Sequence, residues 1–276
     1  MKKRLALLLL FAVLAGGSIL ISTAKGTADI PLGEIFAILG GTRDTAHAQI
    51  LWNIRLPRTI VAALVGINLS LSGAILQAIL RNPLADPHII GISSGAGLAG
   101  IFIMLVLPGA ALLITPGAFV GAMIAAALIY ILAWKDGIRP TRIILAGVAV
   151  SAFLGAGISA MMILYSDRVQ GALMWMVGGL SARTWPHVDM LLPYTIGAGL
   201  LTLCAAQRLN ILQLGDDMAR GIGLAVERTR ILLTALAALL AASAVSVVGL
   251  LGFVGLIVPH AARLMIGSDY RFLLPA

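Results

Sequence analysis

The chain has 276 residues, of which 60% are hydrophobic and only 11% charged, and its mean hydropathy is +1.05. This composition excludes an ordinary soluble domain and predicts an all-α, polytopic membrane protein, with 1–276 as a single transmembrane domain. The net charge of +8 is dispersed over connections between apolar runs, so it indicates no nucleic-acid partner and favours contact with the anionic lipid of the bilayer.

Apolar runs separated by polar connections predict eight membrane spans. In chain order they lie near residues 5–22, 59–80, 89–107, 113–134, 143–165, 190–206, 231–248 and 250–267. The first run follows a basic start, as in a secretory signal peptide. Its apolar stretch continues to Ile21, near the length of a membrane span, and this favours an uncleaved first helix.

The basic residues are distributed unequally between the two sides that eight spans create. Thirteen of the 19 fall at the N-terminus or in even-numbered connections: Lys2, Lys3, Arg4, Arg81, Lys135, Arg139, Arg142, Arg208, Arg220, Arg228, Arg230, Arg263 and Arg271. The other side holds Lys25, Arg43, Arg55, Arg58, Arg168 and Arg183. Because lysine and arginine are in excess on the cytoplasmic side, this bias predicts a cytoplasmic N-terminus.

The apolar run 231–267 is too long for one crossing and barely long enough for two. As one helix it would measure about 55 Å, against a hydrocarbon core of about 30 Å. Its glycines predict a break, because glycine bends the backbone without a side-chain clash. The second half then returns to the starting side, and its end reaches the water boundary. The residues that carry this structural motif are Gly249, Gly252, Gly255, Pro259, His260 and Arg263.

Residues 169–182 are apolar but too short to cross a membrane. They predict a short helix within the outer leaflet, where irregular backbone is tolerated only if protein or a water-filled cavity covers it. Trp175, Gly178 and Gly179 in this segment are therefore candidates for lining a pathway or a gate.

The connection after the second span, RNPLADPHIIGISSGAG over residues 81–97, predicts a rigid cytoplasmic hairpin, because its prolines stop the helix. Asn82 and Pro83 open this motif. Two polar residues, Asn68 and Gln77, lie within the second span itself. They either join neighbouring helices by hydrogen bonds or line a pathway, and the sequence favours neither alternative.

Several kinds of chemistry are not indicated by the sequence. No GxxxxGK[ST] string occurs, so no Walker-type nucleotide loop is predicted. The four histidines alternate between the two sides, and neither a metal site, a cofactor nor a catalytic residue is expected. The acidic residues all lie in or beside connections, which argues against a proton- or sodium-coupled carrier: Asp29, Glu34, Asp44, Asp86, Asp136, Asp167, Asp189, Asp216, Asp217, Glu227 and Asp269. A transporter of this kind is not an enzyme and takes its energy from a partner.

Six motifs occur in order along the chain: RLPR (55–58), SGAILQ (72–77), residues 81–97, ILAGVAVSA (144–152), WMVGGL (175–180) and GFVGLIVPHAARLMIG (252–267). Together they resemble the FecCD family of ABC importer permeases for iron-siderophores, haem and cobalamin. The resemblance implies the type II importer permease fold, of whose usual ten spans eight are present and the last two are missing. It also implies a second permease copy, as a homodimer or a paralogous heterodimer, cytoplasmic ABC ATPase subunits, an extracytoplasmic substrate-binding protein and a bacterial inner-membrane location.

The resemblance assigns two contact regions. Arg55 and Arg58 are spaced i, i+3 at the outer end of the second span, and the family implies that they dock the binding protein; their alternative role is to anchor the helix end at the interface. The connection 207–230 is implied to be the cytoplasmic segment that couples to the ATPase, or else is a solvated loop. Its contact residues are expected to be Gly215, Asp216, Asp217, Ala219, Arg220 and Gly223.

Two other functions remain open at this point. One is an ion-coupled secondary transporter or channel, against which the positions of the acidic residues argue. The other is an inactive, truncated permease paralogue, which the missing spans allow. An iron-siderophore is the first expectation for the cargo of an active importer, with haem and cobalamin as alternatives.

Overall fold

The computed structural model describes residues 2–26, 28–41, 45–88, 91–135, 137 and 139–276. The regular elements of these residues are helices, which confirms the predicted all-α fold. Three connection residues named in the sequence analysis, Arg43, Asp44 and Asp136, lie outside the described residues, as does the start of the span expected at 89–107.

The longer helices are α1 (Lys2–Ala24), α4 (Leu56–Leu80), α5 (Ile92–Val106), α6 (Ile114–Ala133), α7 (Pro140–Leu164), α9 (Trp185–Cys204), α12 (Val226–Val248) and α13 (Val254–Ile266). Shorter ones are α2 (Leu32–Leu39), α3 (Ala46–Ile50), α8 (Val169–Val177), α10 (Ala206–Gln213), α11 (Asp216–Gly221) and α14 (Tyr270–Leu273). A π-helical turn (Leu51–Arg55) joins α3 to α4, and 3-10 turns (Pro108–Leu113 and Ser166–Arg168) precede α6 and α8.

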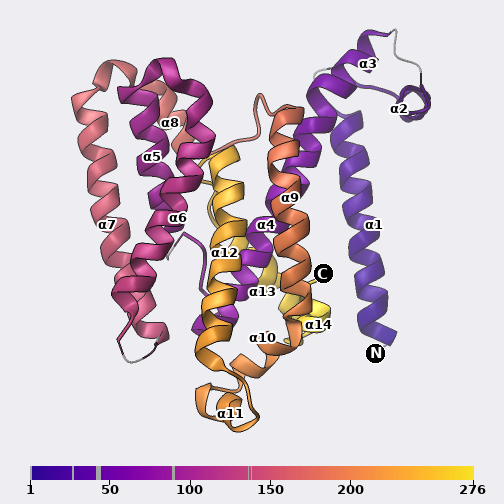
Figure 1. Ribbon diagram of the computed structural model, residues 1–276. Coiled ribbons are helices and arrows are strands. Elements are labelled where there is room, and N and C mark those ends of the chain that lie inside the picture. The colour runs from indigo at the N-terminus through magenta and orange to yellow at the C-terminus, as the bar shows by residue number, and fades with distance from the viewer. Residues whose placement is uncertain (1, 27, 42–44, 89–90, 136, 138) are drawn as a thin grey trace.

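The centre of the bundle is formed by α4 and α12, which pack against each other (Figure 1). Most of the apolar window of each is buried, 67% for the segment containing α4 and 72% for α12. Both helices are rich in alanine, serine and other small residues on their contact faces, which lets neighbouring helices approach closely. α9 and α13 complete this central group, while α5, α6, α7 and α8 form a second group beside it.

Small residues also explain the contact between α5 and α6. Gly95 and Gly121 lie so close that a Cβ atom on either would overlap the backbone of the other. Such a contact places the two helix axes nearer than larger side chains allow. The hairpin of α5 and α6 is therefore specified by glycine at one point on each helix.

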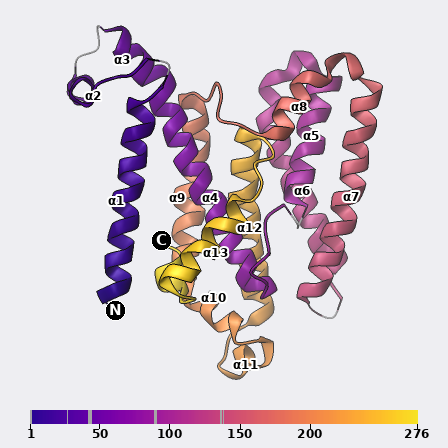
Figure 2. The same ribbon diagram turned by 180° about the vertical axis from the view of Figure 1, so that it is seen from behind.

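α1 stands at the edge of the bundle and is attached mainly at its two ends (Figure 2). At its C-terminal end, the Ser22 and Thr59 hydroxyls are 2.8 Å apart. At its N-terminal end, Arg4 lies 3.8 Å from the Asp269 carboxylate, and its guanidinium stacks 5.1 Å from the centre of the Phe272 ring. None of its apolar window is buried inside the chain, so its sides remain available to lipid or to another chain.

Each of the eight predicted spans corresponds to a helix, but two are shorter than expected. Within the described residues, six helical segments are long and apolar enough to cross a membrane. α5 and α13 are shorter apolar helices. The expected crossing at 250–267 is wrong in length: α13 has 13 residues and spans about 20 Å, because the chain is not helical between Gly249 and Phe253.

The break between α12 and α13 occurs where the glycines predict it. Gly249 ends α12 with φ of 82°, an angle that glycine adopts without strain. The reversal is completed at Phe253, whose φ of 67° is unusual for a residue with a side chain. The sequence therefore predicted the position of the break, but not that residues 249–253 would be non-helical and that α13 would begin only at Val254.

Candidate functional site

The segment between α9 and α12 projects from the end of the bundle at which the N-terminus lies (Figure 1). Residues 206–225, which contain α10, α11 and the turn into α12, are called the knob below. Gly215 precedes α11 with φ of 102°, and Gly223 follows it with φ of 87°. Because both angles favour glycine, these two residues set the directions in which the chain enters and leaves α11. The knob thus consists of two short helices, with a glycine turn before α11 and another after it.

Ion pairs attach the knob to the central helices. Asp216 Oδ1 accepts a hydrogen bond from Arg230 Nη2 of α12 at 2.9 Å and lies 3.7 Å from Arg81 Nη2 at the end of α4. The Arg230 side chain is only 1% exposed. A buried guanidinium needs a charged partner, so Asp216 fixes the start of α11 against both α4 and α12.

Two of the expected contact residues make contacts within the chain. Ala219 is fully buried, and Asp216 is occupied by Arg230 and Arg81. Both residues therefore stabilise the knob from within, and Asp216 remains 23% exposed at its surface. Asp217 is fully exposed, and Arg220 lies between it and Glu227, at 3.6 Å and 3.5 Å.

The tip of the knob carries apolar side chains that the sequence analysis did not single out. Leu214, Met218 and Ile222 are 55%, 63% and 61% exposed. Met218 and Ile222 are spaced i, i+4, which places them on one side of the helical turn. In the sequence, the i, i+4 spacing of two apolar residues within a polar segment is the signal that could have identified this apolar surface. Apolar side chains that project together beyond a bundle indicate a surface for another protein.

At the opposite end of the bundle, Arg55 and Arg58 differ in their surroundings. Arg55 is only 8% exposed, and its guanidinium donates to the backbone carbonyls of Thr23, Ala24 and Ala28. It therefore holds the end of α1 against the start of α4. Arg58 is exposed. The end of α1 therefore covers Arg55, whereas Arg58 is the arginine of this pair that is exposed.

The side chains of Asn68 and Gln77 both form hydrogen bonds with other helices of the chain. Asn68 is fully buried, and its Nδ2 donates to the Ser243 Oγ of α12 at 3.1 Å. Gln77 is 3% exposed; its Oε1 accepts from Arg263 Nη2 at 2.8 Å, and its Nε2 donates to the Leu256 carbonyl at 3.3 Å. Of the two alternatives, the structure favours hydrogen bonding between helices over lining of a pathway.

The gate candidates Trp175, Gly178 and Gly179 cover the break between α12 and α13. The Trp175 carbonyl accepts a hydrogen bond from Leu250 N at 3.4 Å, and Gly179 N donates to the Val248 carbonyl at 2.8 Å. Gly178 has φ of 73°, which turns the chain out of α8 at this contact. The short helix expected over 169–182 is present as α8, and its end supplies hydrogen-bonding partners to the non-helical backbone at 248–250.

The hairpin after α4 begins as expected. Arg81 ends α4 in the left-handed conformation, and the Asn82 Oδ1 accepts from Leu84 N at 2.9 Å, while Pro83 is exposed. Such a side-chain bond closes a tight turn, and the proline prevents further helix.

The motif residues of α13 face different surroundings. Gly255 packs against α4, Gly252 has open space around its Cα, Pro259 is buried and His260 is exposed. Arg263 was expected at the water boundary, but it is half-buried and turned toward Gln77. Its side chain reaches a buried acceptor on α4.

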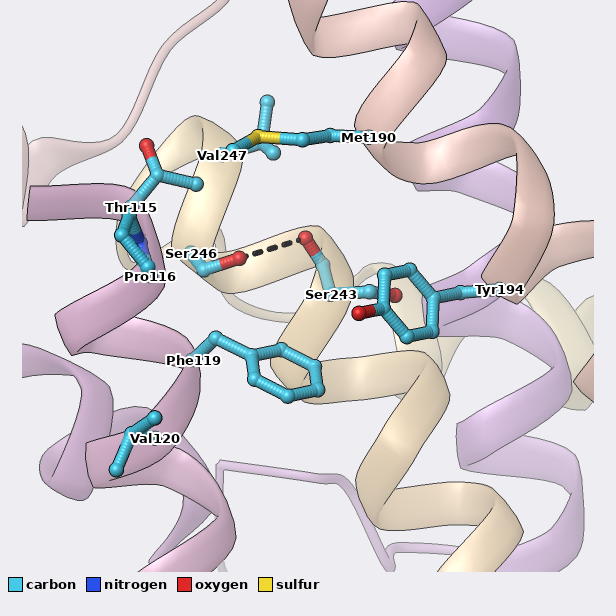
Figure 3. A pocket seen from close by; sticks show the side chains of 9 residues that line it. All are labelled: Thr115, Pro116, Phe119, Val120, Met190, Tyr194, Ser243, Ser246 and Val247. Atoms are coloured by element: carbon cyan, nitrogen blue, oxygen red, sulfur yellow. Dashed lines mark hydrogen bonds between the residues drawn. The ribbon is translucent and has the colours of Figure 1, made fainter. Parts of the chain in front are cut away.

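A cavity lies between the first half of α6, the first half of α9 and the last turns of α12 (Figure 3). Phe119 of α6 and Tyr194 of α9 approach across it, with ring centroids 5.3 Å apart. Ser246 Oγ donates to the Ser243 carbonyl at 3.0 Å on its α12 wall. Its volume is about 160 Å³, below the roughly 300–1,000 Å³ of ordinary small-molecule sites, so it does not accommodate a bulky cargo.

These features define a class: a multi-pass membrane protein with a helical bundle and a projecting knob that presents apolar side chains. The chain belongs to the FecCD transport family, whose family model matches residues 8–276.

Curated relatives have names that describe import permeases. The cobalamin import system permease protein BtuC of Halobacterium salinarum is 43% identical over 237 residues, which cover 85% of this chain and 64% of that protein. The Fe(3+)-citrate import system permease protein YfmE of Bacillus subtilis is 38% identical over 276 residues, covering 100% of this chain and 83% of that protein. The hemin transport system permease protein HmuU of Yersinia pestis is 37% identical over 266 residues, which cover 93% of this chain and 79% of that protein. The chain thus spans about two thirds to four fifths of the length of these relatives.

A solved structure described as an inward-facing conformation of a metal-chelate type ABC transporter has the same fold. It superposes with a TM-score of 0.87 at 27% sequence identity, covering 98% of this chain and 84% of that one. The similarity extends over the central group and the knob alike, since nearly the whole chain is covered.

Proposed function

We propose that the chain is the membrane-spanning permease subunit of an ABC importer that moves an iron chelate into the cytoplasm. The energy comes from ATP hydrolysis in separate subunits. Family membership and the names of the relatives support an import permease. The observation on which the proposal mainly rests is the projecting knob, whose tip exposes Leu214, Met218 and Ile222.

The knob is the proposed contact with a cytoplasmic ATPase subunit. Its exposed apolar tip suits a cleft on a folded partner, and the exposed charges of Asp217 and Arg220 surround that tip. Gly223 shapes the turn behind it. The excess of basic residues on the same side supports a cytoplasmic position for the knob and the N-terminus.

Displacement of the knob would act on the central helices. Asp216 joins the start of α11 to Arg230 in α12 and to Arg81 at the end of α4. Closure of the ATPase pair would thus tilt α4 and α12 as the knob moves. The cargo passage is proposed between two permease copies and would open alternately to the two sides of the membrane.

A binding protein on the outer side would deliver the cargo. Arg58 is proposed to contact an acidic side chain of that protein, because an exposed guanidinium binds carboxylates through two parallel hydrogen bonds. Arg55 acts beneath it by holding the ends of α1 and α4 together. A location in the plasma membrane, with the N-terminus in the cytoplasm, completes this arrangement.

An iron chelate is the proposed cargo class. Relatives are named for ferric citrate, ferric hydroxamate, hemin and cobalamin, and most of these cargoes are bulky iron complexes. In this arrangement the binding protein provides most of the selectivity, and the passage provides a wide apolar surface.

The proposal is tested by reconstituting the chain in vesicles with its ATPase and binding protein. ATP-dependent uptake of ferric citrate, a ferric hydroxamate, haem and cobalamin is then compared. Met218→Asp and Ile222→Asp should each weaken ATPase binding by about tenfold or more, because each places a charge in an apolar contact. Arg208→Ser, on the exposed side of α10, is the matched control and should bind normally.

Two outcomes would contradict the proposal. Uptake that continues without ATP would indicate an ion-coupled transporter, and unchanged ATPase binding in both aspartate variants would place the contact elsewhere. An absence of any uptake despite normal assembly would support an inactive paralogue.

A further inference from the structure

The knob is connected to a second element besides α4 and α12. Asn210 of α10 contacts the start of α14 with both atoms of its amide group. Its Nδ2 donates to Asp269 Oδ1 at 2.8 Å, and its Oδ1 accepts from the backbone N of Tyr270 at 2.9 Å. A side chain that satisfies a donor and an acceptor at one helix start fixes both the position and the orientation of that helix.

The carboxyl group of Asp269 is ionised at neutral pH. It accepts from the Arg271 guanidinium at 2.7 Å and lies 3.8 Å from Arg4. The hydrogen bonds from the Arg271 side chain, the Asn210 side chain and the Arg271 backbone lower the pKa of the Asp269 carboxyl well below its usual range. The contact with Asn210 is therefore fully formed at neutral pH.

Tyr270 extends the connection from α14 into the bundle. Its side chain is fully buried, and its Oη donates to the Ala74 carbonyl of α4 at 3.2 Å. The same oxygen accepts from Gln213 Nε2 of α10 and from Arg263 Nη2 of α13, each at 3.4 Å. One hydroxyl thus joins the knob to α4 and α13.

From Arg263 the contacts continue to the first turn of α13. Arg263 Nη2 also donates to Gln77 Oε1 at 2.8 Å, and Gln77 Nε2 donates to the Leu256 carbonyl at 3.3 Å. These hydrogen bonds form a continuous series from α10 in the knob to both ends of α13.

α13 is suited to move as a unit. It has only 13 residues, begins after the non-helical segment at Gly249 to Phe253, and ends at Gly267, which has φ of 97°. Four of its residues are buried. A short helix between two glycine-containing turns is held in place mainly by the contacts at its ends and against α4.

We infer that Asn210 and Tyr270 are positioning residues that transmit displacement of the knob through α14 to α13. This inference rests on the proposed function, because it assumes that an ATPase moves the knob. α4 and α12 receive the same displacement through Asp216, so the contacts of Asn210 and Tyr270 add a second path that reaches the short helix. Loss of that path uncouples movement of α13 from ATP hydrolysis while leaving the ATPase contact intact.

The test uses the complete transporter in vesicles and measures cargo taken up per ATP hydrolysed. Asn210→Leu removes both amide bonds at similar volume, and Tyr270→Phe removes only the hydroxyl. Each should lower the cargo-to-ATP ratio by about fivefold or more, the usual lower range of coupling between sites, while ATP hydrolysis stays within about twofold. Arg208→Leu, two residues from Asn210 on the exposed side of α10, should keep the ratio of the unmodified protein.

A purely structural role predicts a different pattern. Uptake and hydrolysis would fall together at a constant ratio, or both variants would fail to assemble, and either result would overturn the inference. Absence of ATP-driven uptake in the unmodified protein and in Arg208→Leu would instead contradict the proposed function itself. Asn210→Ser, which keeps a shorter donor and acceptor, should recover part of the ratio lost in Asn210→Leu.

Discussion

Gly73 of α4 lies directly against the backbone of Gly255 in α13. A Cβ atom at Gly73 would overlap the Gly255 carbonyl, and a Cβ at Gly255 would lie 2.8 Å from the Leu69 carbonyl. Two glycines at one crossing point allow the axes of α4 and α13 to approach more closely than any pair of larger residues. This contact sets the position of the short helix against the central one.

Gly73→Ala should therefore destabilise the protein. Overpacking a tight contact costs about 1–3 kcal/mol, and the gain in helix propensity from alanine, about 1 kcal/mol, offsets only part of this. The measurement is the thermal unfolding midpoint of the purified protein in detergent. Gly66→Ala on the same helix is the control, since a Cβ there meets no atom within 4 Å. Equal unfolding midpoints for Gly73→Ala and Gly66→Ala would contradict the prediction, because they would show that α4 and α13 can move apart to accommodate the added methyl group.

Arg55 and Arg58 should give opposite phenotypes although they are three residues apart. Arg55→Met should lower the unfolding midpoint, because the buried guanidinium leaves three backbone carbonyls at the end of α1 without its hydrogen bonds. Arg58→Met should leave the midpoint unchanged and weaken binding of the extracytoplasmic partner. Binding isotherms and melting curves of both variants separate the two effects. A loss of partner binding with unchanged stability in Arg55→Met would contradict the assignment.

Asp216→Asn should loosen the knob from α12. It removes the carboxylate from Arg230, whose side chain is 1% exposed, and breaking a buried pair costs about 3–5 kcal/mol when one charge remains. Asp216 is itself 23% exposed, so we expect a cost of about 3 kcal/mol, near the lower end of that range. Proteolysis within residues 206–225 should accelerate accordingly. Asp217→Asn, at a fully exposed position, is the control and should be cleaved at the original rate.

Gly249→Ala should disrupt the break between α12 and α13. Gly249 has φ of 82°, and a Cβ atom there would overlap the Trp175 carbonyl. Both effects act in the same direction, so the expected destabilisation is about 2 kcal/mol or more. Gly252→Ala, in the same non-helical segment with open space at its Cα, should be tolerated. Similar unfolding midpoints in the two variants would mean that backbone conformation at Gly249 is not required.

Local sequence features predicted those parts of the fold that depend on local chemistry. The glycines of 249–255 identified the end of α12, and the short apolar length of 169–182 identified α8. Gly215 and Gly223 likewise determine the turns on either side of α11, because the positive φ at each favours glycine.

The orientation of long polar side chains was not predictable in this way. Arg55 faces inward because the end of α1, about thirty residues earlier in the chain, folds over it. Gln77 and Arg263 are 186 residues apart and meet only through tertiary packing. A hydropathy pattern records neither contact. The exposed apolar tip differs from these two cases, because the i, i+4 spacing of Met218 and Ile222 is a local signal in the sequence.

The non-helical turn after Val248 has a consequence for how the protein is made. Backbone groups exposed to hydrocarbon are costly, and Trp175 and Gly179 provide partners for two of those near this turn. Both residues leave the ribosome more than sixty positions before Val248. The hairpin of α12 and α13 is therefore synthesised only after the neighbour that provides these hydrogen-bonding partners.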